Sequence, residues 1–125
     1  MLRKNKKRVD RMVATNKRPW GYFEVLADAP DHKVKRIVVE PGGILSLQRH
    51  KLRSEHWFIV SGKAKAIIDD KNYDLSAGSA LDIPKGAKHR VENSSHENLV
   101  IIEVQTGEYF GEDDIERLED KYGRI

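Results

Sequence analysis

Short stretches of β-branched and alternating residues recur along the chain, separated by turn signals. The stretches predicted as strands are 33–39, 44–50, 55–60, 64–68, 73–75, 79–83, 88–93 and 98–105. Turns are expected at 41–43, 61–63 and 69–72, and Gly62 and Gly86 suit turn positions of positive φ. Turn signals about every 8 to 12 residues, with no long helical pattern between them, predict an all-β barrel or jelly roll.

One segment near the end of the chain has a helical pattern. Glu112, Asp113 and Asp114 are acids of the kind that stabilise the first turn of a helix. Ile115 and Leu118 follow at i, i+3 spacing, so they would lie on one face of that helix. The pattern therefore predicts a short C-terminal helix over residues 112–121.

The charge of the chain is divided unevenly. Residues 1–18 carry eight basic side chains and one acid, which leaves 15 basic and 19 acidic side chains in the other residues. The net charge of +3 therefore belongs to a basic N-terminal arm, residues 1–17, and residues 18–125 are expected to form one domain. Such an arm suits nucleic acid or an acidic surface, but no aromatic residue interleaves with its charges. An extension that packs on a neighbouring subunit is favoured, and nucleic-acid binding is not expected.

Composition also indicates the compartment. The chain has no cysteine, so disulfides play no part in its stability. No apolar run reaches the roughly 18 residues needed to cross a membrane. The N-terminus is too basic and too poor in apolar residues for a secretory signal. We therefore expect a cytoplasmic protein without a membrane-spanning segment.

Two segments between residues 42 and 93 carry candidate metal ligands. Side chains alternate along a strand, so Gln48 and His50 point to the same face. A short turn at 51–54 returns the chain so that Glu55 enters the same cavity, and the turn at 84–86 leads in His89. Nitrogen and oxygen ligands without thiolate fit Zn²⁺, Mn²⁺, Fe²⁺, Co²⁺ or Ni²⁺. The sequence thus predicts a divalent metal inside the barrel, with these ligands: Gln48, His50, Glu55 and His89.

Some of these residues could have structural roles instead. The two histidines could be ordinary core residues, and Glu55 could pair with Arg53 or Lys51 instead of a metal. His56 is expected to point away from the pocket, because it follows Glu55 directly on a strand.

Glu103 is the other candidate for chemistry. It shares a strand face with Gln105, opposite the apolar side chains at 100, 102 and 104. A carboxylate on an otherwise apolar strand is costly unless it is paired or functional. Glu103 is therefore a candidate for acid–base work or for binding a substrate hydroxyl. A buried structural ion pair is the alternative.

The two metal-ligand segments resemble the paired motifs of the cupin superfamily. The stretches 45–50 and 53–57, together with 18–21, 102–107 and the tail 111–124, resemble the type II mannose-6-phosphate isomerases more narrowly. The likeness covers about residues 18 to 124. It implies a cupin double-stranded β-helix (a jelly-roll barrel), carrying here the short C-terminal helix and the basic N-terminal arm.

The resemblance also implies an activity and roles for particular residues. The activity is a metal-dependent interconversion of mannose 6-phosphate and fructose 6-phosphate through an enediol(ate), with Zn²⁺ as the first choice of ion. In this reading Arg53 is an active-site clamp for phosphate or enediolate, Lys88 assists with the phosphate, Gln105 contacts the substrate and Glu103 shuttles the proton. Arg117 and Arg124 match the tail and are expected to form structural pairs with nearby aspartates.

The resemblance also has consequences for domain organisation, oligomeric state and the choice of substrate. In many members this barrel follows a sugar-phosphate guanylyltransferase half, so the 125 residues here predict a stand-alone isomerase domain. A homodimer is the expected state. Lys51 and Leu52 stand where the family is richer in histidine, which keeps open a different sugar phosphate or a nucleotide sugar as substrate. A non-catalytic sugar-binding or regulatory cupin is the remaining alternative.

Overall fold

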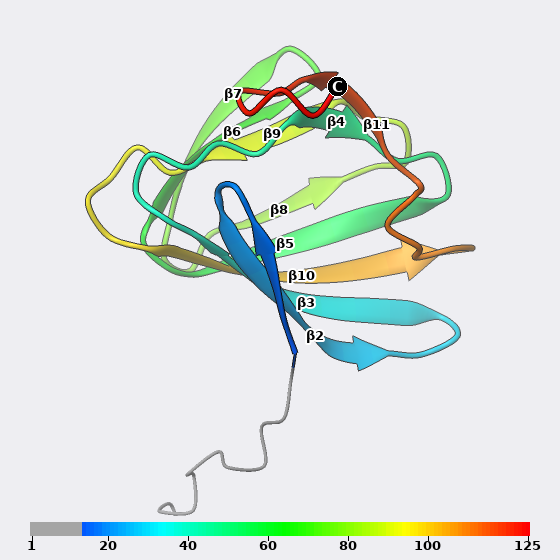
Figure 1. Ribbon diagram of the computed structural model, residues 1–125. Coiled ribbons are helices and arrows are strands. Elements are labelled where there is room, and N and C mark those ends of the chain that lie inside the picture. Colours follow the sequence, from blue (N-terminus) through cyan, green and yellow to red (C-terminus); the bar gives the residue numbers. More distant parts are fainter. Residues whose placement is uncertain (1–13) are drawn as a thin grey trace, which may run out of the picture.

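Two antiparallel sheets face each other and enclose the interior of the molecule (Figure 1). The structure is a computed structural model and describes residues 14–125. One sheet has the order β1-β2-β3-β10-β5-β8 and the other β11-β4-β9-β6-β7. The strands are β1 (Thr15–Arg18), β2 (Gly21–Asp28), β3 (His32–Val39), β4 (Leu47–Arg49), β5 (Arg53–Ser61), β6 (Lys63–Ile68), β7 (Lys71–Ser76), β8 (Ala80–Ile83), β9 (His89–Glu92), β10 (Leu99–Gly107) and β11 (Glu116–Glu119). The predicted all-β cupin barrel is confirmed.

The predicted strands correspond to β3 through β10, with shifted ends. The largest shift is in β4, which covers only Leu47–Arg49 of the predicted 44–50. Gly62 and Gly86 have φ angles of +90° and +80°, as the turn chemistry requires. The strands β1, β2 and β11 were not predicted. β1 and β11 are edge strands, defined by their pairing rather than by a strong local pattern, and β2 lies between β1 and β3. Residues 15–17 of the predicted arm belong to β1, and residues 1–13 lie outside the described part of the chain.

The predicted C-terminal helix is wrong. Residues 108–115, here called the crossover segment, run from the six-stranded sheet to the five-stranded sheet, and β11 then pairs with β4 (Figure 1). The acidic residues that were predicted to begin this helix make other contacts. Glu112 pairs with Lys35, and the carboxylate of Asp114 accepts hydrogen bonds from the backbone N–H groups of Lys51 and Leu52. These long-range contacts outweigh a weak local helix signal.

Apolar side chains from both sheets fill one end of the interior. The strands β3, β5, β6 and β10 each contribute alternate residues to it, as expected for strands with one face buried. Its most deeply buried members are Val39, Ile59, Val91, Leu99 and Ile101. Trp20 and Trp57 are also buried in it. The other end of the same strands carries polar side chains, so a polar cavity lies next to the apolar core.

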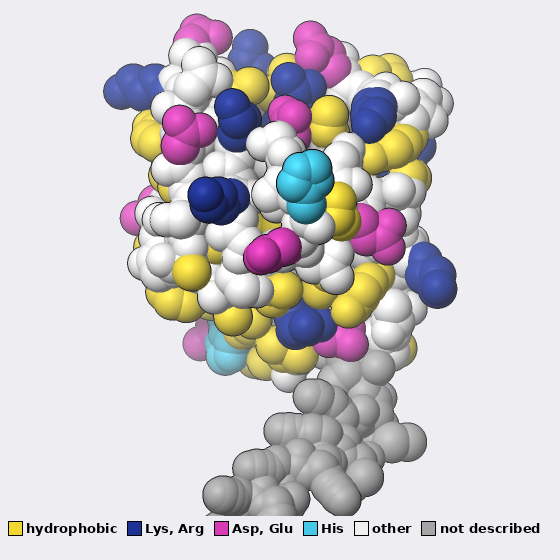
Figure 2. Space-filling view, turned by 90° about the vertical axis from the view of Figure 1, so that its left-hand side faces the viewer, with side chains coloured by type: hydrophobic (Ala, Val, Ile, Leu, Met, Phe, Trp, Pro, Cys, Tyr) yellow, Lys and Arg dark blue, Asp and Glu magenta, His cyan; other side chains and the backbone are white. Residues whose placement is uncertain are grey.

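The outer surface carries few large apolar side chains. Phe58 and Val60 are 43% and 45% exposed on the outer face of β5, so Phe58 is not a core residue. The predicted homodimer stays a prediction. Figure 2 shows basic and acidic side chains dispersed among apolar ones over the end of the barrel that it views. Within the described residues, no helix has the length and apolarity needed to span a membrane.

Candidate active site

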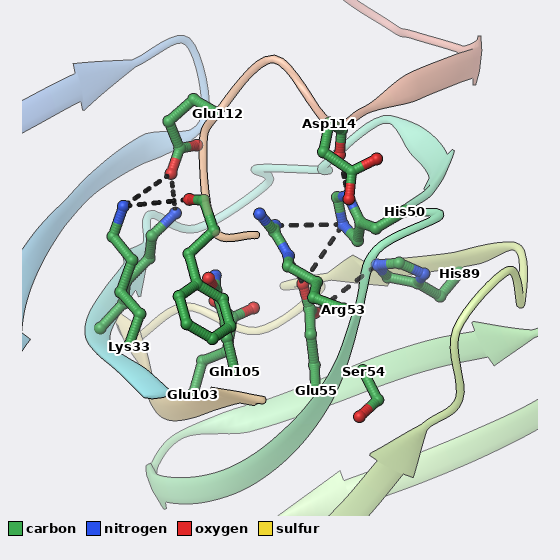
Figure 3. A network of polar contacts seen from close by, with 12 residues as sticks. Lys33, His50, Arg53, Ser54, Glu55, His89, Glu103, Gln105, Glu112 and Asp114 are labelled. Atoms are coloured by element: carbon green, nitrogen blue, oxygen red, sulfur yellow. Dashed lines mark hydrogen bonds and ion pairs between the residues drawn. The ribbon is translucent and has the colours of Figure 1, made fainter. Parts of the chain in front are cut away.

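Three buried residues bring potential metal-ligand atoms together. His50 follows β4, Glu55 lies on β5 and His89 begins β9, so both sheets contribute. One ligand atom from each lies within 4.8 Å of the others. The Nε2 atom of His50 is 3.2 Å from Oε2 of Glu55, and Nε2 of His89 is 3.7 Å from Oε1 (Figure 3). Three of the four predicted metal ligands therefore converge on one point.

Backbone carbonyls orient both imidazoles. The Nδ1–H of His50 donates to the carbonyl oxygen of Asp114 at 2.7 Å, and the Nδ1–H of His89 donates to that of Ala87 at 3.0 Å. Each ring thus directs the lone pair of Nε2 toward Glu55, and the lone pair of His50 also accepts a hydrogen bond from Arg53. The Nε2 atom of His89 is buried and has no hydrogen-bond partner among the described residues. An acceptor nitrogen of this kind fits a divalent metal.

Both histidines are held in the neutral form that binds metals. Burial, and to a smaller extent the nearby Arg53 guanidinium, lower the pKa of His50 to about 4. Burial also lowers the pKa of His89, against a smaller opposing effect of its bond to Ala87. Because a protonated imidazole has no lone pair to give, these shifts prepare the pair for a cation at neutral pH.

Gln48 lies beside this group. It is on β4, where its register partner is His89 on the neighbouring β9, and its half-buried side chain lines the same pocket. Two residues opposite each other in an antiparallel pair point to the same face. An amide oxygen is therefore close to the other three groups, and Gln48 stays a predicted ligand.

Arg53 is buried inside the barrel rather than exposed in a turn. Its Nε donates to Oε2 of Glu55 at 3.0 Å, and its Nη2 lies 3.3 Å from Nε2 of His50. The plainer reading of Glu55, an ion pair with Arg53, is thus observed alongside the metal-ligand geometry. The Nη1 atom of Arg53 is buried without a partner among the described residues, so the guanidinium has a donor left for a bound molecule.

Glu103 faces the same cavity from β10 and is joined to Glu55 through Trp57. The indole Nε1–H of Trp57 lies 3.1 Å from Oε1 of Glu55 and 3.2 Å from Oε2 of Glu103, so it is shared between the two carboxylates. The side-chain amide of Gln105 donates to Oε1 of Glu103 at 2.6 Å. Burial raises the pKa of Glu103 to about 7, and the charge of Glu55 raises it too. Glu103 forms no ion pair with any described residue, so its neutral form is stabilised mainly by burial and by the neighbouring charge of Glu55.

Two buried lysines at the site were not among the predicted residues. Lys33 and Lys35 lie on the inner face of β3, and Lys35 donates to Oε2 of Glu112 at 2.5 Å while Lys33 donates to the carbonyl of Phe110 at 3.2 Å. These bonds dock the crossover segment over the cavity (Figure 3). The sequence does carry a signal for their inward orientation, because Lys33 and Lys35 alternate in register with the apolar Ile37.

Other candidates lie outside the pocket. Lys88 is exposed, does not line the cavity, and its backbone N–H donates to Asp69, so the structure does not bring it to the other predicted site residues. His56 points outward as predicted and pairs with Asp82. Asn93 is fully buried and donates to backbone carbonyls of Val39 and Glu97, so its role is structural.

Comparisons with known proteins agree on one family. The sequence profile described as "Mannose-6-phosphate isomerase C-terminal" matches residues 4–120. The alginate biosynthesis protein AlgA of Pseudomonas aeruginosa is 50% identical over 107 residues, which are 86% of this chain and 22% of AlgA. A mannose-1-phosphate guanylyltransferase of Klebsiella pneumoniae is 43% identical over 86% of this chain and 23% of its own. The chain therefore spans less than a quarter of the length of these relatives.

A solved structure supports the fold. An uncharacterised Klebsiella pneumoniae protein with a double-stranded β-helix domain superposes with a TM-score of 0.73 at 21% identity. The superposition covers 90% of this chain and 95% of the other. At this identity the likeness bears on the fold alone, and it agrees with the two facing sheets described above.

Proposed function

Because the chain belongs to the mannose-6-phosphate isomerase C-terminal family, we propose that it interconverts mannose 6-phosphate and fructose 6-phosphate with one bound divalent ion. The observation that carries the proposal is one cavity that contains both a candidate metal site and a candidate proton-transfer group. The His50–Glu55–His89 group suits a metal, and a carboxyl group of raised pKa lies beside it. Isomerisation of an aldose to a ketose needs a polarised carbonyl and a group that moves a proton between adjacent carbons.

The metal requirement is met by neutral nitrogen and carboxylate donors. His50, Glu55 and His89 would hold the ion, with Gln48 as a fourth ligand. Such an ion supplies Lewis-acid polarisation of the sugar carbonyl. The ligand types fit Zn²⁺ first and also admit Mn²⁺, Co²⁺, Fe²⁺ or Ni²⁺.

Glu103 is the proposed proton carrier. With a pKa of about 7, its carboxyl group exchanges a proton readily near neutral pH, which suits a general acid–base catalyst. Trp57 and Gln105 hold its two oxygens by hydrogen bonds, so the group is fixed in place against the cavity. Glu103 would take the proton from one sugar carbon and return it to the neighbouring carbon. Gln105 is proposed to contact the substrate as well, through its buried Oε1, which has no hydrogen-bond partner among residues 14–125.

Arg53 is proposed to stabilise charge on the reacting oxygens. Its guanidinium lies between Glu55 and His50, against the metal group, and Nη1 is free among the described residues. A developing enediolate oxygen would accept a charge-assisted hydrogen bond there.

A coupled assay tests the proposal directly. Metal-stripped protein would be reloaded in turn with Zn²⁺, Mn²⁺, Co²⁺ and Mg²⁺ and supplied with mannose 6-phosphate, while formation of fructose 6-phosphate is followed. The His50→Ala, His89→Ala double variant serves as the blank. Metal-dependent turnover that is absent from the blank supports the isomerase. Tight metal binding without turnover would contradict it and favour another sugar phosphate, or a sugar-binding cupin without catalysis.

A further inference from the structure

Three arginines gather at the part of the pocket formed by the ends of the described chain. Arg18 closes β1, Arg117 lies on β11 and Arg124 is next to the last residue, and all three line the cavity that also holds the metal group. Arg124 is neutralised by Asp120 through bonds of 2.7 and 3.0 Å. This confirms the aspartate pairing expected for Arg124, whereas Arg117 has no such partner among the described residues.

The remaining two guanidiniums have no carboxylate partner in the described part of the chain. Arg117 is half-buried, and its buried Nε has no hydrogen-bond partner there. Within the described residues, Arg18 donates only to the carbonyl of Lys17, and it lies over the ring of Phe23 at 4.9 Å. Burial lowers the pKa of Arg117, and the neighbouring Arg124 lowers it further. Positive charges so arranged repel one another until an anion is present.

The pocket's other basic side chains each have a carboxylate partner, and burial raises the pKa of the remaining acid, Glu103, to about 7. Five basic and three acidic side chains line it. Arg53 pairs with Glu55, and Lys35 pairs with Glu112. Arg18 and Arg117 are left over, and their combined charge matches a phosphate monoester, which carries about −1.5 to −2 at pH 7.

Strand register connects this charge to the reacting centre. Arg117 is the register partner of Gln48, and Gln48 is the register partner of His89. The three residues form one row across β11, β4 and β9 and share a face, so Arg117 lies two strand spacings, or about 10 Å, from the histidine strand. A hexose 6-phosphate has its phosphate at one end of the carbon chain and its reacting carbons at the other.

We infer that Arg18 and Arg117 form the phosphate-binding subsite of this pocket, and that Arg53 remains with the metal group. The choice of a hexose 6-phosphate as ligand rests on the proposed function. The subsite itself requires only a phosphate monoester. Arginine suits this role because its planar donors match phosphate oxygens in pairs.

Binding measurements on the full chain in the presence of a chelator test the inference. Titration calorimetry would compare mannose 6-phosphate, mannose and inorganic phosphate. Mannose 6-phosphate should bind at least about tenfold more tightly than mannose, and Arg117→Gln should weaken it about 10- to 100-fold. Arg49→Gln is the matched control, because Arg49 lies beside Gln48 on β4, pairs with Glu116 and does not line the pocket. It should bind as the wild type does.

The outcomes separate this inference from the proposed function. Equal affinity of the wild type for mannose and mannose 6-phosphate would overturn the subsite. So would an affinity for mannose 6-phosphate that is unchanged in Arg117→Gln. Either result could occur in an active isomerase, so it would leave the proposed function standing. Phosphate-dependent binding that is lost in Arg117→Gln, without turnover in the coupled assay, would keep the subsite and reject the isomerase. If Arg117→Gln does not fold, Arg18→Gln on the edge strand β1 decides the matter by the same criterion.

Discussion

The two halves of the barrel interior are built by the same strands, yet burial has opposite consequences in them. On β5 the inward residues change from Arg53 and Glu55 to Ile59, and on β10 they change from Glu103 to Ile101. In the apolar half, each Å² removed from water stabilises the fold by about 25 cal/mol. In the polar half, each buried charge loses hydration, and hydrogen bonds to its neighbours only partly restore that loss.

This contrast indicates what each half contributes. The apolar half holds the two sheets in register, and the register places the polar groups. The polar half contributes little net stability, because its ionic groups are compensated mainly by one another. It holds instead neutral histidines and a carboxyl group of raised pKa, which are properties that serve binding and proton transfer. Four changes test this division, from the largest expected effect to the smallest.

Removing a metal ligand should have the largest effect. We expect His89→Ala to weaken binding of Zn²⁺ by more than about 100-fold, since losing even an outer partner of a ligand commonly costs 10- to 100-fold. Competition with a chromophoric chelator would measure it. His56→Ala is the control, because His56 is exposed on the opposite face of β5 and pairs with Asp82. Equal loss in both variants would place the metal elsewhere.

Truncating the apolar half should have the largest effect on folding. Ile59 is fully buried, so Ile59→Ala removes apolar contacts and leaves a cavity. We expect the free energy of unfolding to fall by about 2 to 5 kcal/mol. Urea unfolding of metal-free protein would measure it. Val60→Ala, at a side chain that is 45% exposed, should stay within about 0.5 kcal/mol of the wild type. A similar loss in both would contradict the contrast between the two faces of β5.

Neutralising Glu103 should change how stability depends on pH. The folded protein keeps this proton up to a pKa of about 7, whereas the ordinary value is 4.5. The contribution of Glu103 is therefore fully present below about pH 4.5 and is lost as the pH rises through 7. Relative to Glu103→Gln, the metal-free wild type should lose up to about 3 kcal/mol between those pH values.

Unfolding free energies of both proteins at pH 5 and pH 8 would measure this difference. Parallel pH dependence of the wild type and Glu103→Gln would show that Glu103 is ionised in the folded state. That result would remove it as a neutral-pH proton carrier.

The crossover segment should show the smallest effect. Asp114→Ala removes two hydrogen bonds to the backbone of Lys51 and Leu52, in the turn that follows His50. We expect a loss of about 1 kcal/mol in the free energy of unfolding, since part of this site is open to water. Thermal unfolding would measure it, with the exposed Asp70→Ala as control. No difference between the two variants would mean that the acid does not hold the segment in place.

Much of the site was readable because it depends on local alternation. Gln48 and His50 share a face, Glu55 enters where the chain returns, and Glu103 lies opposite a run of apolar residues. Period-2 alternation together with turn residues determines these positions. The helix predicted over 112–121 failed for the opposite reason, because Glu112 and Asp114 are bound by groups more than sixty residues away in the chain.

The sequence by itself determined the all-β class, the turns at Gly62 and Gly86 and the inward direction of the ligand residues. Only the tertiary structure decided which inward residues meet. It joined Trp57 to two carboxylates, buried Lys35 against Glu112 and set Arg117 in one row with Gln48 and His89. The physical reason is that alternation sets which side of a strand a side chain takes. Pairing between distant strands sets its neighbours, and neighbours determine protonation, charge balance and what the cavity can bind.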